Sequence, residues 1–360
     1  MKSFKLKSFK LYLLAFVLLV TLKLQSQNLP QVEVSPHAKV IQEVGLSEVT
    51  IDYHRPAVKG REIWNKLVPY GMTNLGFGTA KESPWRAGAN ENTTISFSDD
   101  VKINGQDLPA GTYGLHMIVT EKDWTIIFNK ENTAWGSFFY DPQMDALRVT
   151  VSPENSDFTE WLQYGFENLS DKSADIFLKW EKKKIKFTAS FDLDKVVLDR
   201  YRKALVGIGG FNAQTYEQAA AYCISRNINL DEATKWIDHS IEIQENATNL
   251  LTKSQLLEKM GQKAEAEALT KKAISIASEN ELNSYGYNLM LQQNQIDKAL
   301  EIFRINVDKH PESWNAYDSL AEAYARKGSR DEAIKYYKMA LSRSPKSQTQ
   351  RIQKAISSLQ

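Results

Sequence analysis

The sequence predicts a protein of two domains, an antiparallel β-sandwich followed by an α-helical solenoid. Between Gln31 and Asp192, apolar residues alternate with polar ones, which is the period of a half-buried strand. Further along, four similar phrases recur at spacings of 33, 33 and 34 residues, which indicates stacked helical repeats. The chain has 360 residues, 42% of them hydrophobic, which is enough for two domains with cores of their own.

The first 26 residues predict a signal peptide. Four lysines lie within Lys2–Lys10, an apolar run follows from Leu11 to Leu22, and the small residue Ser26 offers a cleavage position. A bilayer span needs about 20 apolar residues, and this run is shorter. We therefore expect a periplasmic or secreted protein with no membrane span after cleavage. The alternative is that the segment stays uncleaved as a membrane anchor.

Charge and composition exclude several classes of protein. The formal net charge is +1, which does not favour nucleic acid or an anionic membrane as a partner. The single cysteine, Cys223, cannot form a disulfide within the chain, and we expect it to be a small buried side chain in a helix. No phosphate-binding loop, serine-hydrolase elbow or zinc-protease motif occurs, so no cofactor and no catalytic residue is predicted.

Residues 27–195 predict the β-sandwich, with roughly nine or ten short strands. Asn104–Gly105 is a strong hairpin signal. Two alternating runs, Ile176–Trp180 and Ile185–Ala189, flank the charged stretch Glu181–Lys184, which we interpret as a hairpin turn. Short strands at this spacing favour an antiparallel sandwich or barrel over a parallel sheet.

Seven short motifs follow one another in this domain: Ser35–Ala38, Tyr53–Pro56, Lys59–Trp64, Leu67–Gly71, Trp85–Glu91, Leu108–Tyr113 and Trp124–Asn129. Together they resemble the bacterial family called domain of unknown function 2911, over about residues 31–191. The stretch Met72–Pro84 departs from the family pattern as an insertion, either a flap or a longer loop. The resemblance implies a fold but no activity.

The loops of this domain carry a set of charged and polar residues suited to ligand binding. The candidates are His54, Arg55, Arg61, Arg86, Asn90 and Glu91. If the arginines converge, they would clamp a carboxylate or phosphate of an anionic small molecule or a glycan. The alternative is that the arginines form ion pairs with Asp52, Glu62 and Glu91 and hold the loops together.

Three further hypotheses concern this domain. A periplasmic, hydrolase-like enzyme would have its site around His54, Arg55, Arg61 and Arg86. A metal site is not predicted, because the histidines lack the close spacing typical of ligands. The tryptophans Trp64, Trp85 and Trp135 either stack on a sugar or belong to the core.

The repeats of the second half are centred on four alanines, Ala233, Ala266, Ala299 and Ala333. The residues four and seven positions after each alanine lie on the same helix face as the alanine, and this small side chain allows two helices to approach closely. This pattern resembles the tetratricopeptide repeat family. We expect a lead-in helix and glycine-rich joint over residues 196–213, four repeats over 214–347 and a capping helix over 348–360.

The resemblance implies a concave surface that binds a peptide or another protein. The candidate residues on it are Tyr222, Gln255, Asn288 and Glu322. Of the lysine and asparagine clamp that some family members use for a terminal carboxylate, only Asn288 has a counterpart, so such binding is not predicted. The alternative is an array that only dimerises or braces the other domain. The sequence as a whole favours a non-enzymatic envelope protein that binds partners with both domains.

Overall fold

The computed structural model describes residues 32–360, and the chain divides into two compact units. The first unit ends at Val196 and the second runs from Val197 to Gln360. The predicted signal peptide lies outside the described residues. Among residues 32–360, none of the helices combines the length and the apolar character needed to cross a bilayer.

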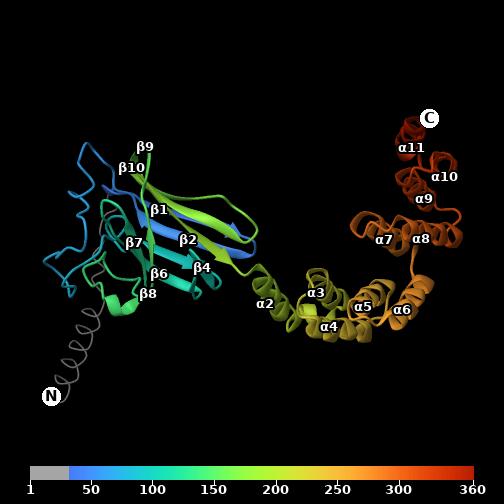
Figure 1. Ribbon diagram of the computed structural model, residues 1–360, viewed down its shortest axis with the longest axis horizontal. Helices are drawn as coiled ribbons and strands as arrows, with labels where there is room; N and C mark the ends of the chain where they lie inside the picture. The colour runs from blue at the N-terminus through green and yellow to red at the C-terminus, as the bar shows by residue number, and fades with distance from the viewer. Residues whose placement is uncertain (1–31) are drawn as a thin grey trace, which may run out of the picture. The chain divides into compact units, whose positions relative to one another are not determined.

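The first unit consists of two antiparallel sheets, as the period of the sequence predicts. One has six strands in the order β1-β2-β3-β6-β7-β8, and the other has four in the order β5-β4-β10-β9 (Figure 1). The strands are β1 (His37–Val44), β2 (Ser47–His54), β3 (Thr94–Phe97), β4 (Val101–Ile103), β5 (Gln106–Leu108), β6 (Gly111–Ile118), β7 (Trp124–Asn129), β8 (Asp145–Val151), β9 (Glu154–Glu167) and β10 (Ser173–Phe191).

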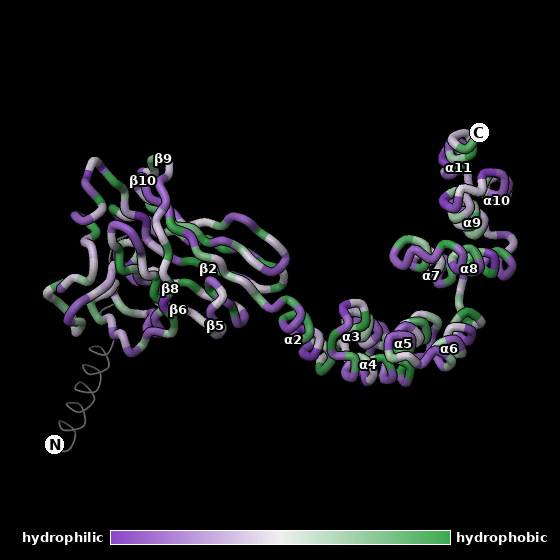
Figure 2. The backbone as a smooth tube through the Cα atoms, viewed as in Figure 1, coloured by the Kyte–Doolittle hydropathy of each residue, from purple (hydrophilic) through white to green (hydrophobic). Residues whose placement is uncertain are grey.

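The two sheets share one hydrophobic core. Phe128 on β7 and Phe187 on β10 place their ring centroids 5.8 Å apart, and Tyr53 on β2 meets Tyr164 on β9 at 4.8 Å. Alternate residues of each strand enter this core, which is why hydrophobic and hydrophilic residues interleave along the chain in Figure 2. This is a two-layer arrangement built around a shared interior.

The hairpin predicted at Glu181–Lys184 is wrong, because β10 continues through this stretch as one strand. Glu181 has a positive φ of 55°, and the register against β9 shifts on both sides of it. The residue in the left-handed region interrupts the alternation, so that Trp180 and Ile185 both face the core although they are an odd number of residues apart. The charged run is therefore a bulge and not a turn.

The second unit is a series of packed helices (Figure 1). The helices are α2 (Leu193–Leu205), α3 (Ala213–Arg226), α4 (Leu230–Ile243), α5 (Ala247–Lys259), α6 (Lys263–Ile276), α7 (Glu279–Tyr287), α8 (Ile296–Lys309), α9 (Trp314–Lys327), α10 (Arg330–Arg343) and α11 (Lys346–Leu359). A π-helical turn, Asn288–Gln292, follows α7, and short 3-10 turns occupy Ile208–Phe211 in this unit and Pro142–Met144 in the first. The lead-in helix α2 begins three residues before the predicted start at residue 196. The capping helix α11 begins two residues before the predicted start at residue 348.

The pairs α3–α4, α5–α6, α7–α8 and α9–α10 stack as the repeat pattern predicts. The four anchor alanines are 0%, 1%, 0% and 0% exposed, so each lies where two helices come close together. Cys223 is also buried, in α3, as expected. Because each pair covers an apolar face of the next, the unit is held by contacts between neighbours.

A close approach between α7 and α8 gives a test of this packing. A Cβ atom added at Gly286 would lie 2.5 Å from the ring of Phe303, which is itself 0% exposed. Alanine is the better helix former by about 1 kcal/mol, but overpacking a core costs about 1–3 kcal/mol. We expect Gly286→Ala to lower the free energy of unfolding, measured by urea titration of the helical circular dichroism. Ser284→Ala, at an exposed position of the same helix, is the control and should not lower it. An unchanged urea midpoint in Gly286→Ala would contradict this packing.

Candidate functional site

The cavity of the β domain is formed by the long segment between β2 and β3. Strand β3 pairs with β6 only from Gly111 to Gly114, so the second half of β6 pairs with β7 on one edge and lacks a strand on the other. The backbone of Trp85 pairs there with Met117, with N–H to carbonyl distances of 2.9 and 2.8 Å. The segment is thus fixed on the six-stranded sheet, and the side chains beside this pairing line the cavity.

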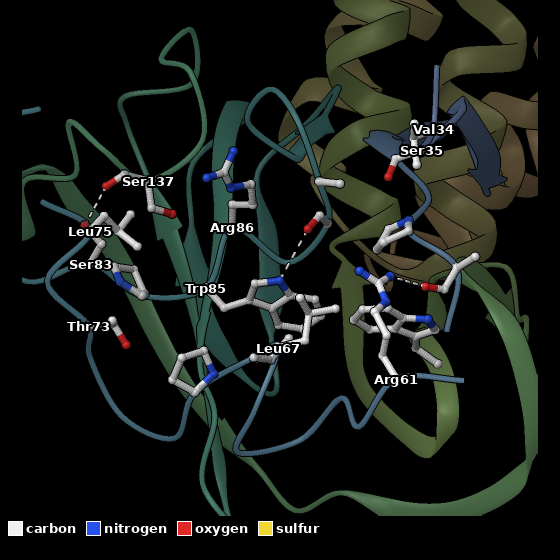
Figure 3. Close-up of a pocket in the computed structure, with 18 of the residues that line it drawn as sticks. Val34, Ser35, Arg61, Leu67, Thr73, Leu75, Ser83, Trp85, Arg86 and Ser137 are labelled. Atoms are coloured by element: carbon white, nitrogen blue, oxygen red, sulfur yellow. Dashed lines mark hydrogen bonds between the residues drawn. The ribbon is translucent and has the colours of Figure 1, made fainter. Parts of the chain in front are cut away.

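The cavity has a volume of about 510 Å³, and its wall carries positive charge (Figure 3). Its apolar lining includes Leu67, Val68, Leu75, Trp85 and Trp180, and its polar lining includes Ser35, Thr73, Ser83 and Ser137. The ionisable residues that line it are Lys59, Arg61 and Arg86, and no described Asp or Glu lines it. Thr73, Leu75, Ser83 and Pro84 belong to the stretch expected as an insertion, so this stretch forms one wall.

Arg86 is half-buried and held by uncharged groups. Its Nη1 donates to the carbonyl oxygen of Asn90, and its guanidinium lies 5.1 Å from the ring centroid of Phe138. A Cβ atom at Gly136 would lie 2.3 Å from the guanidinium carbon, so the glycine gives Arg86 its place. Burial lowers the pKa of Arg86 below its ordinary value. No ion pair joins it to a carboxylate within residues 32–360.

The other two candidate arginines also bond to backbone carbonyls. Arg61 donates from Nε to Val58 O at 3.1 Å and from Nη2 to Ala57 O. Arg55 donates from Nε to Leu162 O at 2.8 Å on β9 and does not line the cavity. Of the three, Arg61 and Arg86 are therefore brought to one cavity, on opposite sides of Trp85 in Figure 3.

Two of the three carboxylates expected to pair with the arginines, Asp52 and Glu91, pair with histidines instead. His54 is buried between Glu33 and Glu91, at 3.1 and 3.2 Å, and Asp52 contacts His37 at 2.6 Å. Ion pairs between the three arginines and Asp52, Glu62 or Glu91 do not occur in the described part of the chain. His54, Asn90 and Glu91 lie outside the cavity lining. Within the same part, no group of His, Cys, Asp or Glu is arranged to hold a metal ion.

Four tryptophans form a cluster at the cavity, and two of them, Trp85 and Trp180, line it. Trp85 and Trp180 stack with centroids 6.0 Å apart and an interplanar angle of 17°, while Trp64 contacts Trp124 at 4.8 Å. The indole N–H of Trp180 is buried with no acceptor among the described residues. Trp64 and Trp85 therefore belong to this cluster, whereas Trp135 is 54% exposed. Trp180 and Lys59 are lining residues that the sequence pattern did not single out.

His116 lies behind the cavity wall and is uncharged. It is 2% exposed, and its Nδ1 is 2.9 Å from the hydroxyl oxygen of Ser137, a lining residue. Burial, followed by the positive charge of Arg86, lowers the pKa of His116 to about 3. A neutral imidazole adds no positive charge to that of Lys59, Arg61 and Arg86 at the cavity wall.

The pKa of His116 predicts a pH-dependent stability. Below its ordinary pKa of 6.5 the unfolded chain protonates His116 and the folded chain does not, so stability is lost as the pH falls from 6.5 toward 3. The slope is at most about 1.4 kcal/mol per pH unit. We expect His116→Gln to flatten the pH dependence of the unfolding free energy between about pH 7 and about pH 5, followed by tryptophan fluorescence.

The control for this measurement is His239→Gln, which replaces an exposed histidine of the helical unit. It should leave the slope of the tryptophan transition unchanged. Equal slopes in the wild type and His116→Gln would show that His116 takes up a proton in the folded protein as readily as in the unfolded one.

The repeats form a second pocket, of about 370 Å³, from the first helices of three pairs. Gln255 and Asn288 line it, as do Glu217 and Ala221 of α3 and Asn280, Glu281, Ser284 and Tyr285 of α7. The other two candidates lie elsewhere. Tyr222 packs against Tyr201 at 5.6 Å, and Glu322 accepts from the Tyr287 hydroxyl at 2.8 Å and from Arg326 at 3.0 Å.

Glu217 gives this second pocket its charge. It is partly buried, it accepts a hydrogen bond of 2.6 Å from the Thr252 hydroxyl, and burial raises its pKa. Glu281 also lines the pocket but is engaged in the capping box of α7 with Ser278. No described Lys or Arg lines the pocket. Sequence reasoning missed Glu217, because nothing in the repeat pattern shows which polar residue of a helix is half-buried.

Comparison with family models agrees with both resemblances. The family described as protein of unknown function (DUF2911) matches residues 35–189, and the tetratricopeptide repeat model matches residues 247–280 and 315–347. The two repeat matches coincide with the pairs α5–α6 and α9–α10. A comparison with curated proteins finds no match.

Several solved structures are similar to the chain. A crystal structure of MamA is 22% identical with a TM-score of 0.27, covering 41% of this chain and 85% of that one. YrrB, described as a TPR protein with an unusual peptide-binding site, is 21% identical with a TM-score of 0.25, covering 42% and 78%. PilF of Pseudomonas aeruginosa is 16% identical with a TM-score of 0.28, covering 41% and 67%.

Proposed function

Since the chain joins a DUF2911 domain to a unit of tetratricopeptide repeats, we propose that it is a non-enzymatic scaffold of the bacterial envelope. In this proposal the repeats bind a segment of another protein, and the β domain holds a small ligand in its cavity. Export rests on the basic and apolar character of residues 1–26.

The observation that carries the protein-binding role is the pocket on α3, α5 and α7. Stacked repeats present the same face of successive first helices side by side, and a bound segment can contact several repeats at once. Gln255 and Asn288 lie on that face in neighbouring pairs. Amide side chains at such positions are suited to hydrogen bonds with the backbone of an extended peptide.

The charge of the pocket indicates which side chain it accepts. Glu217 lies in it without an opposite charge within the described residues, and the amides supply acceptor oxygens. A lysine or arginine of the bound segment would supply the missing counter-charge. A terminal carboxylate would meet Glu217 and no cation, so the pocket is unsuited to it.

The enzyme alternative has less support from the geometry. It places a site around His54, Arg55, Arg61 and Arg86, and two of these four line the cavity while the other two are held elsewhere. A general base must lie within hydrogen-bond reach of its substrate, and His54 is engaged by two carboxylates outside the cavity.

Panning a displayed peptide library against the chain without residues 1–26 tests the repeat proposal. We expect the selected sequences to be enriched in lysine or arginine. Glu217→Gln should weaken a selected peptide about 10- to 100-fold in fluorescence anisotropy, the range for losing a charge-assisted hydrogen bond. Glu267→Gln, an exposed residue of α6, is the matched control and should bind as the wild type does.

Two results would contradict the proposal. If the selected peptides are not enriched in lysine or arginine, Glu217 does not hold a cation of the bound segment. If the chain selects no peptide and sedimentation shows a dimer that blocks this face, the repeats are an array that only dimerises.

The raised pKa of Glu217 adds a pH dependence to peptide binding. The carboxyl group must lose its proton to hold a cation, and burial makes that loss occur at a higher pH than in an exposed glutamate. We therefore expect the affinity for a basic peptide to fall as the pH is lowered into the acid range. Glu217→Gln should abolish this dependence in the same anisotropy titration, and an identical pH profile in both proteins would assign it to another group.

A further inference from the structure

We infer that the cavity of the β domain binds a small organic anion with a flat apolar body, such as an aromatic carboxylate. The inference deepens the ligand-binding role proposed above for this domain and rests on it. It depends on three features of the cavity, which are its charge, the way its arginines are held and its tryptophan floor.

The charge of the wall has one sign. Lys59, Arg61 and Arg86 line the cavity, and no described carboxylate does. Glu160 accepts a bond of 2.9 Å from the backbone N–H of Lys59, but it does not line the cavity. Lys59 and Arg61 are exposed, whereas Arg86 is half-buried, and taking a guanidinium out of water is costly unless a counter-charge accompanies it. An anion in the cavity would supply the counter-charge that the described chain does not.

The arginines are held in place without being neutralised. Carbonyl oxygens of Val58 and Ala57 fix Arg61, while the carbonyl of Asn90 and the ring of Phe138 fix Arg86. These partners carry no net charge, and each guanidinium has further N–H groups beyond those they use. A guanidinium that is oriented in advance loses less entropy when it binds a carboxylate in a bidentate manner.

The floor of the cavity is flat and apolar. Trp180, which stacks on Trp85 at 17°, is only 1% exposed, so the aromatic surface open to a ligand is that of the partly exposed Trp85, with Leu67 and Val68 beside it in the lining. A planar ring of a ligand would stack favourably on such a surface.

The size of the cavity fits a small ligand. Its volume of about 510 Å³ falls in the range of small-molecule sites, and a mostly apolar lining with a few charged groups is typical of them. A neutral sugar would also stack on tryptophan but would leave the half-buried Arg86 without a counter-charge. The charge therefore favours the anion over the neutral sugar.

Three probes with the same ring system test the inference by isothermal titration calorimetry on the chain without residues 1–26. They are 2-naphthoate, 2-naphthylmethanol and 2-naphthylmethylamine, which differ in charge. We expect 2-naphthoate to bind about 10- to 100-fold more tightly than the alcohol, and the amine to bind most weakly. Arg86→Gln should remove this preference and, separately, Arg61→Gln should reduce it, and both should leave the affinity for the alcohol unchanged.

Arg55→Gln is the matched control, because Arg55 bonds to Leu162 O outside the cavity, and it should keep the preference for the anion. A cooperative thermal unfolding transition shows that each variant is folded. If Arg86→Gln does not fold, the test is made with Arg61→Gln. Equal affinities for naphthoate and the alcohol in the wild type would overturn the anion inference while keeping a ligand site. Failure of all three probes to bind would overturn the ligand-binding role as well.

Discussion

Two backbone hydrogen bonds between Trp85 and Met117 determine where the cavity lies. They form because β3 ends before β6 does, so that the loop between β2 and β3 completes the sheet in its place. The side chain of Trp85 then packs on Trp180 of the opposite sheet, and Arg86, the next residue, lies at the cavity wall. Without this pairing the arginine and the tryptophan floor would have no fixed relation to each other.

Most of the fold follows from local patterns that the sequence displays. Asn104 and Gly105, with φ of 48° and 84°, form the predicted turn between β4 and β5, because these two residues tolerate the left-handed region. The alanines of the repeats are buried because only a small side chain fits where two helices meet. The hairpin at Glu181–Lys184 was predicted wrongly. The bulge at Glu181 shifts the alternation of apolar and polar residues, and in the sequence a charged run at such a shift resembles a turn between two strands.

The candidate sites were predicted less completely, because they depend on contacts between distant segments. Arg61 and Arg86 were singled out as loop arginines, but only the fold shows that they share a cavity with Trp180. The sequence also left open which carboxylate pairs with which cation. The strand pairing of β1 with β2 sets His37 opposite His54. Asp52 contacts His37, and Glu91, from the segment before β3, contacts His54. Because these carboxylates pair with histidines, the arginines donate to backbone carbonyl oxygens, which carry no net charge.

The two candidate sites share one physical property, a partly buried charge without an opposite charge in the described chain. Arg86 has this property in the β domain, and Glu217 has it in the repeats. Such a group is destabilising on its own, because burial removes hydration and nothing ionic replaces it. A residue that lowers stability is retained more readily where it contributes to binding than where it only supports the fold. The opposite signs of the two groups are the reason why we propose different partners for the two domains, an anion for one and a basic peptide segment for the other.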